Sequence, residues 1–149
     1  INKKNYHLPS RIWFKSSWDK HINYPSLFRA WVSIFKPDIA MLHLFSDPEY
    51  SGDVNYTFDD PHERFMLGSF GGPAQPGIPN AGWAMAFGQK YTDIDILGLR
   101  NAGINVHESG QSKIFQITDE LSDLIDRYDY FEKARTKFKS HFQENTFLL

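Results

Sequence analysis

The segment GWAMAFG, residues 82–88, most constrains what this chain can fold into. It alternates large side chains with small ones and carries no charge. The large residues are Trp83, Met85 and Phe87, and the small ones are Ala84 and Ala86. Successive side chains of a strand point to opposite faces, so the pattern predicts a core strand with one bulky face and one small face. A helix can approach the small face closely, and we expect Trp83 to be buried between the sheet and a helix.

Two apolar segments upstream predict a helix followed at once by a strand. Residues 24–38, YPSLFRAWVSIFKPD, have helical spacing, with Pro25 in the first turn or Ser26 as the cap, and Pro37 ends the helix. Its expected buried face consists of Leu27, Ala30, Trp31, Ile34 and Phe35. Residues 38–45, DIAMLHLF, are apolar on both alternating faces and predict a buried central strand. We expect His43 in this strand to be a hydrogen-bonded core residue.

The second half of the chain predicts a short helix, a hairpin and a long terminal helix. The short helix falls in residues 90–103, with Thr92 as its cap, and the hairpin pairs residues 104–108 with 112–118. The last helix, residues 129–143, buries an aromatic stripe and exposes a basic face. The stripe is Phe131, Ala134, Phe138 and Phe142, and the basic residues are Lys133, Arg135, Lys137 and Lys139. This order predicts one α+β domain over residues 1–149, a mostly antiparallel sheet with helices packed on one face.

Composition excludes several classes of protein. The 149 residues carry 16 basic and 18 acidic side chains, a net charge of −2, which argues against direct nucleic-acid binding. The absence of cysteine excludes a disulfide scaffold and a cysteine nucleophile, and it fits the cytoplasm best. No apolar run approaches the ~20 residues of a membrane helix, and no signal peptide is visible. The chain begins at Ile1, which leaves open whether an upstream segment is missing.

No motif in the chain predicts catalysis, a cofactor or a metal. The glycine- and proline-rich stretch that begins at Gly68 lacks the lysine of a phosphate-binding loop, and its prolines remove backbone N–H donors. We therefore expect an ordered connector there. None of the six histidines is paired with another at metal-ligand spacing. Ser69 lacks the first glycine of a nucleophile elbow, because Leu67 stands in that position.

An acidic segment, residues 46–63, is the strongest candidate for a binding site. It holds six acidic residues and no lysine or arginine. Interleaved aromatic residues would anchor a partner, while the carboxylates would steer a basic one. The predicted partner-binding residues are Asp47, Glu49, Tyr50, Asp53, Tyr56, Phe58, Asp59 and Asp60. A merely solvated loop explains the same composition about equally well.

Residues 79–143 resemble immunity proteins of bacterial polymorphic-toxin systems, of the type VI or contact-dependent kind. The resemblance rests on a proline before a Gly-Trp-x-x-aromatic strand, then a short helix, a glycine-led strand and a terminal helix. The matching residues are Pro79, Gly82, Trp83, Phe87, Gly103 and Phe131. The chain departs from the pattern at residues 84–86, where Ala-Met-Ala replaces a bulkier strand. This motif is structural, so no binding residue is carried over.

The resemblance implies a non-enzymatic protein that binds one cognate toxin, often a nuclease, and blocks it. Two alternatives stay open at this point. One is a small hydrolase or transferase with a site built from His43, His62 and nearby acids. The other is an adaptor subunit of a larger assembly. The sequence does not determine the oligomeric state.

Overall fold

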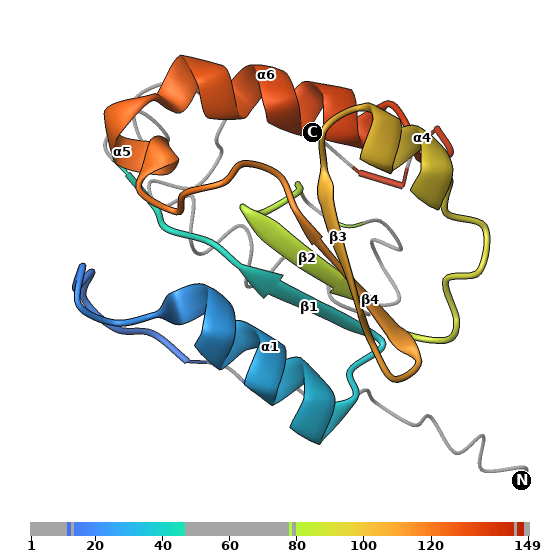
Figure 1. Ribbon diagram of the computed structural model, residues 1–149, viewed down its shortest axis with the longest axis horizontal. Helices are drawn as coiled ribbons and strands as arrows, with labels where there is room; N and C mark the ends of the chain where they lie inside the picture. The colour runs from blue at the N-terminus through green and yellow to red at the C-terminus, as the bar shows by residue number, and fades with distance from the viewer. Residues whose placement is uncertain (1–11, 13, 47–77, 79, 145, 148–149) are drawn as a thin grey trace, which may run out of the picture.

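A four-stranded antiparallel sheet forms the centre of the protein. The computed structural model describes residues 12, 14–46, 78, 80–144 and 146–147. The strand order is β1-β2-β4-β3, and each neighbouring pair is antiparallel (Figure 1). The strands are β1 (Ile39–Leu42), β2 (Ala84–Phe87), β3 (Asn105–Ser109) and β4 (Ser112–Gln116). Together with the helices, this sheet confirms the predicted α+β class, and β3 and β4 form the predicted hairpin.

The helices flank this sheet. They are α1 (Tyr24–Phe35), α4 (Ile96–Asn101), α5 (Asp123–Asp126) and α6 (Tyr128–Lys139). The sequence predicted α1, α4 and α6, and it missed the single turn of α5. The two longer helices, α1 and α6, lie on opposite sides of the strands in Figure 1.

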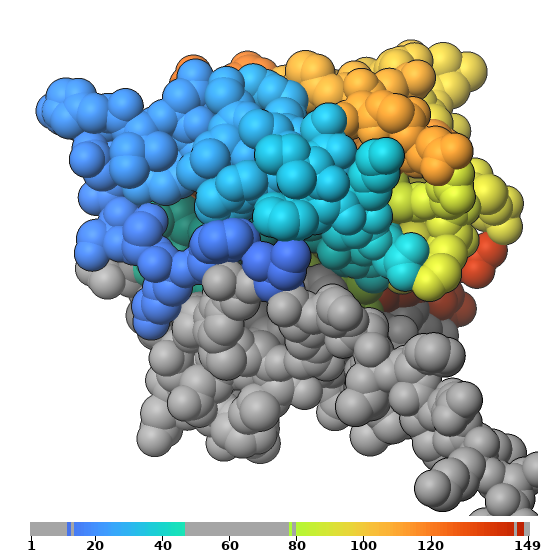
Figure 2. Space-filling view, turned by 90° about the horizontal axis from the view of Figure 1, so that it is seen from below, coloured from blue at the N-terminus to red at the C-terminus, as the bar shows by residue number. Residues whose placement is uncertain are grey.

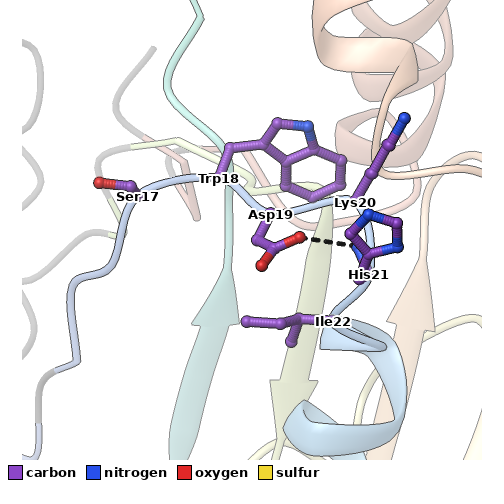
Figure 3. A pocket seen from close by; sticks show the side chains of 6 residues that line it. All are labelled: Ser17, Trp18, Asp19, Lys20, His21 and Ile22. Carbon is purple, nitrogen blue, oxygen red and sulfur yellow. Dashed lines mark hydrogen bonds between the residues drawn. The ribbon is translucent and has the colours of Figure 1, made fainter.

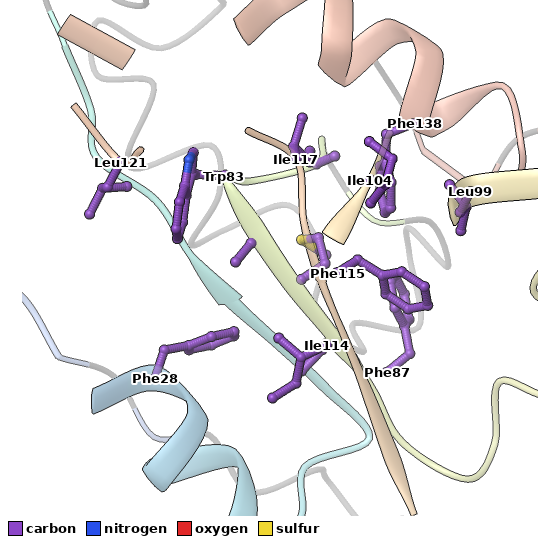
Figure 4. Close-up of a cluster of buried hydrophobic side chains, with 14 of the residues drawn as sticks. Phe28, Trp83, Phe87, Leu99, Ile104, Ile114, Phe115, Ile117, Leu121 and Phe138 are labelled. Carbon is purple, nitrogen blue, oxygen red and sulfur yellow. The ribbon is translucent and has the colours of Figure 1, made fainter. Parts of the chain in front are cut away.

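The two faces of the sheet are covered by different helices. Met85 pairs with Phe115 in register, and the Phe115 ring lies 5.9 Å from that of Phe138 in α6. The next pair, Ala86 and Ile114, points to the opposite face. There α1 contacts β1, β3 and β4, and Figure 4 shows its Phe28 beside Ile114. We expected the helices on one face, but β2 is buried on both faces and needs a cover on each.

The small-residue face of β2 is the one that receives α1, as the alternation predicted. Ala40 of β1 pairs with Ala86, so two methyl groups lie side by side beneath the helix. Short side chains let the helix backbone approach the sheet, and Phe28 and Val32 fill the remaining space, at 6% and 2% exposure. The bulky face instead packs against an aromatic cluster at the end of α6. Its ring pairs are Phe87 with Phe142, Phe138 with Phe142, and Phe142 with Phe147.

Strand β1 is shorter and more exposed than the sequence predicted. Only residues 39–42 of the predicted 38–45 are strand, and all four are partly exposed. Among the described strands β1 pairs with β2 alone, so it is an edge strand and not a central one. Apolar composition on both faces does not distinguish the two positions, because an edge strand can also be covered above and below.

Helix α6 buries its predicted aromatic stripe but does not leave its whole basic face in water. Phe131 and Phe138 are fully buried, as expected, yet Arg135 is also buried, at 4% exposure. Its guanidinium forms an ion pair with Glu132 and lies over the Phe131 ring, 5.0 Å from the centroid. Lys139 donates to the side-chain oxygen of the buried Asn80 at 3.1 Å. Burial lowers the pKa of Lys139, so this part of the basic face belongs to the protein interior.

The N-caps of α1 and α4 each lie three positions from the predicted cap. Pro25 lies in the first turn of α1, as expected, but the cap is Asn23, whose side-chain oxygen accepts from the Ser26 N–H at 2.9 Å. In α4 the cap is Asp95, which accepts from the Gly98 N–H at 2.8 Å, and not Thr92. Both side chains satisfy N–H groups that the helix itself leaves without a partner.

Trp83 lies in the deepest part of the core, which confirms that it is buried. Its side chain is fully excluded from solvent, and its indole N–H donates to the Thr118 hydroxyl at 2.9 Å and to the Glu120 carbonyl at 3.1 Å. The indole therefore joins β2 to the segment that leads into α5, where Leu121 is also buried (Figure 4).

We predict that Trp83→Ala lowers the free energy of unfolding by about 3–5 kcal/mol, because it leaves a large cavity. Trp83→Phe keeps most of the volume but removes the indole N–H, and should cost about 1–3 kcal/mol. Chemical denaturation followed by circular dichroism measures both. A wild-type midpoint for Trp83→Ala would contradict the position of this side chain in the core.

Gly88 ends β2 at a point where a side chain does not fit. A Cβ there would lie 2.6 Å from the Pro37 carbonyl oxygen, which is backbone and cannot rotate away. We predict that Gly88→Ala destabilises the protein by about 1–3 kcal/mol through this overlap. The neighbouring Gln89→Ala, at an exposed position, is the control, and equal melting temperatures for the two variants would reject the close approach.

Candidate partner-binding surface

The predicted partner-binding residues all fall in a segment outside the described residues. They are Asp47, Glu49, Tyr50, Asp53, Tyr56, Phe58, Asp59 and Asp60. His62 also lies outside the described residues, and so does the glycine- and proline-rich stretch from Gly68 to Gly77. The acidic segment therefore stays a prediction from sequence, and the described surface is a separate source of candidates.

Helix α1 carries an exposed apolar surface that the sequence did not predict. The buried residues of this helix are Phe28 and Val32, not the expected stripe. Of that stripe, Ile34 is 69% exposed, and Leu27 and Phe35 are also exposed. Ala30 is exposed too, and only Trp31 is partly buried. The prediction of the buried face of α1 was wrong, and most of the residues it named point to solvent.

The chain before α1 folds back and extends this surface. Phe14 stacks on Trp31 with ring centroids 4.0 Å apart, and Trp18 stacks on Tyr24 at 5.3 Å. The Tyr24 hydroxyl accepts from the Asp19 N–H and donates to the Ser17 carbonyl, both at 3.1 Å. We call the exposed group the α1 surface, defined as Phe14, Leu27, Trp31, Ile34 and Phe35. Figure 2 shows α1 and the segment before it side by side on one side of the molecule.

The chain segment that carries the α1 surface is rich in basic residues. Between residues 14 and 36 the chain carries four basic residues and a single acidic one, although the whole chain has a net charge of −2. The basic residues are Lys15, Lys20, Arg29 and Lys36. Asp19, the one acid, accepts from the His21 N–H at 2.9 Å and shapes the turn before the helix (Figure 3). Lys15 and Lys36 adjoin Phe14 and Phe35 of the α1 surface in sequence, and Lys20 lies in the turn before the helix; all three are exposed, and we call them the cationic rim.

The pocket that the structure offers here does not resemble a small-molecule site. It is an open hollow lined by six consecutive residues of the turn before α1, from Ser17 to Ile22 (Figure 3). Ligand pockets usually enclose most of their ligand between several elements. Six neighbouring side chains on one turn make a depression that widens the α1 surface rather than a binding cavity.

The titratable groups of the described residues serve structural roles where their contacts are known. His43 follows the last residue of β1 and is partly buried, and its Nδ1 accepts from the Trp83 N–H at 3.2 Å; the predicted hydrogen bond is confirmed, but the position inside the strand is not. Lys90 donates a hydrogen bond to the Asp38 carboxylate, just before β1, and this bond raises the pKa of Lys90. Within residues 14–46 and 80–144, no three histidine or carboxylate side chains are grouped to hold a metal ion.

One signal in the sequence could have revealed the α1 surface. Seven of the ten residues from Leu27 to Lys36 are apolar, and they cover more than half of the helix circumference at 3.6 residues per turn. A single sheet face covers about one stripe of a helix. A helix this apolar must therefore bury one stripe and leave a second for solvent or for a partner.

Comparison of the chain with protein-family models, with curated proteins and with solved structures found no match. Among the helices of the described residues, none combines the length and the hydropathy needed to cross a membrane. The fold class is α+β, and candidates for function come from the surface of the described residues.

We predict that the two sides of α1 respond oppositely to substitution. Phe28→Ala should cost about 3–5 kcal/mol of unfolding free energy, because it empties a core position. Ile34→Gln should change stability by no more than about 0.5 kcal/mol, because the side chain already contacts water. Urea denaturation of both variants measures the difference, and a large loss for Ile34→Gln with little for Phe28→Ala would mean that α1 is rotated about its axis.

Proposed function

We propose that this chain is a non-enzymatic immunity protein, which binds one cognate bacterial toxin in the cytoplasm and neutralises it. The observation that carries the proposal is the α1 surface, where exposed apolar and aromatic side chains gather on one helix and on the segment before it. Proteins rarely expose such a patch without a partner for it. Tryptophan and tyrosine, which are enriched in binding hot spots, occur here as Trp31 and as the stacked pair of Trp18 and Tyr24.

The contacts of His43 favour binding over catalysis. A hydrolase or transferase site built on this histidine would need one ring nitrogen to accept a substrate proton. Nδ1 instead accepts the backbone N–H of Trp83, just before β2, at 3.2 Å, and a neutral ring in this state carries its proton on Nε2, which then donates and does not accept. The ring also packs at 4.8 Å from Phe45 and 6.0 Å from Phe131. These contacts suit a residue that holds the end of β1 against the core.

The acidic segment supplies the second part of the proposal. A nuclease toxin must hold phosphate in a cationic cleft, and the carboxylates of Asp59 and Asp60 are natural competitors for such a cleft. Exposed ion pairs contribute only ~0.2–1 kcal/mol each. Their main effect is to accelerate association, and salt weakens that effect.

The test begins with the gene next to the one that encodes this chain. We expect its product to be a toxin that stops growth when expressed alone, and we expect co-expression of this protein to restore growth. The purified pair should form a stoichiometric complex, measured by calorimetry. A neighbouring product that is not toxic, or toxicity that this protein leaves unchanged, would refute the immunity function.

With that toxin, we predict that Asp59→Asn/Asp60→Asn slows association by about tenfold at low salt and much less at high salt. The reason is loss of long-range attraction to a basic surface. Stopped-flow fluorescence measures the rates. The control is Asp126→Asn/Glu144→Gln, which removes the same charge from two other exposed positions, and equal rates for both double variants would assign no role to the acidic segment.

A further inference from the structure

We propose that the α1 surface binds a protein partner whose apolar centre is bordered by carboxylates. The inference rests on the proposed function, because it describes the surface through which the toxin, or its binding region, is held. It also specifies a chemistry that the acidic segment does not have, since the two regions carry opposite charge.

The apolar side chains of the surface stand on a rigid support. Ile34, Leu27 and Phe35 are exposed on adjacent turns of α1, beside the stacked pair of Phe14 and Trp31. The helix beneath them is held to the sheet by Phe28 and Val32, so these side chains are already in place. Binding then costs little ordering of the backbone, which is the main benefit of a preorganised surface.

The cationic rim determines which partner fits. Lys15, Lys20 and Lys36 are exposed, and Arg29 donates to the Ser26 hydroxyl at 3.0 Å on the polar side of α1. A partner with carboxylates at the edge of its apolar patch would pair with this rim, whereas a basic rim would be repelled. A second copy of this chain would bring the same cations against each other, so self-association through this surface is disfavoured.

A protein partner fits the geometry better than a lipid surface does. Helices that lie in a membrane interface use a broad apolar face with several basic residues opposite it. Helix α1 already buries part of its apolar circumference against the sheet, through Phe28 and Val32, so the apolar face that it leaves exposed is narrower. The narrower exposed stripe is about what one apolar protein ridge would cover.

The first experiment uses the toxin from the neighbouring gene. Leu27→Gln/Ile34→Gln should weaken the complex by about tenfold or more. The matched control, Leu97→Gln/Ile125→Gln, removes two exposed apolar side chains at other sites, of 70% and 46% exposure, and should leave the affinity within about twofold. If wild-type protein binds the toxin and both double variants bind it equally well, the inference fails while the immunity function stands.

The second experiment needs no toxin and decides the inference if the immunity function fails. Two synthetic amphipathic helical peptides share leucine and tryptophan residues on one face and differ in having flanking glutamates or flanking lysines. The glutamate peptide should bind about tenfold more tightly, shift the NMR signals of Leu27, Ile34 and the Trp31 indole, and lose this preference against Lys15→Glu/Lys20→Glu. Folding of each variant is checked from its NMR spectrum.

Three results would overturn the inference. Equal binding of the two peptides, or signal shifts confined to other regions, would show that the α1 surface does not select a carboxylate border. Tighter binding to vesicles that contain phosphatidylserine than to the glutamate peptide, abolished by Leu27→Gln/Ile34→Gln, would assign the surface to a membrane. Dimerisation of the wild-type protein in sedimentation velocity, abolished by the same variant, would assign it to a second copy of the chain.

Discussion

The structure depends on the burial of β2 on both faces and on both edges. Every residue from Ala81 to Gly88 is buried, and β2 pairs with β1 on one side and β4 on the other. A strand in this position forces a three-layer arrangement, because its alanine face and its aromatic face each need a separate cover. Helix α1 covers the alanine face, and α6 with its aromatic cluster covers the other.

This arrangement links the stability of the protein to its candidate binding surface. The alanines beneath α1 allow the helix to settle close to the sheet, where Phe28 and Val32 are enough to anchor it. Leu27, Ile34 and Phe35 of the same helix have no place in the core and are exposed to solvent. Because the same helix supplies the core contacts and the exposed stripe, the surface is held as firmly as the interior. Such rigidity favours tight, specific binding.

Sequence patterns predicted the elements well wherever one physical signal dominated. The alternation around Trp83 predicted a buried strand, and the turn at Gly110 predicted the hairpin, where a glycine adopts a φ of +59°. The patterns failed where two arrangements satisfy the same composition. Leu27, Phe28, Trp31 and Val32 are all apolar, so helical spacing alone did not tell which stripe meets the sheet. Arg135 in α6 was expected in solvent, but an ion pair with Glu132 and the Phe131 ring compensate its burial.

The sequence by itself determined the class of the fold, a core strand around Trp83 with two unlike faces, and the excess of apolar side chains on α1. These are local properties, since they follow from the spacing of residue types along one strand or one helix. Only the tertiary structure decided that β1 is an edge strand, that helices cover both faces, and which stripe of α1 is left outside. The physical reason is that burial is a relation between distant segments. A leucine and a phenylalanine on the same helix are equivalent until a particular sheet, with methyl groups at particular positions, lies against one of them.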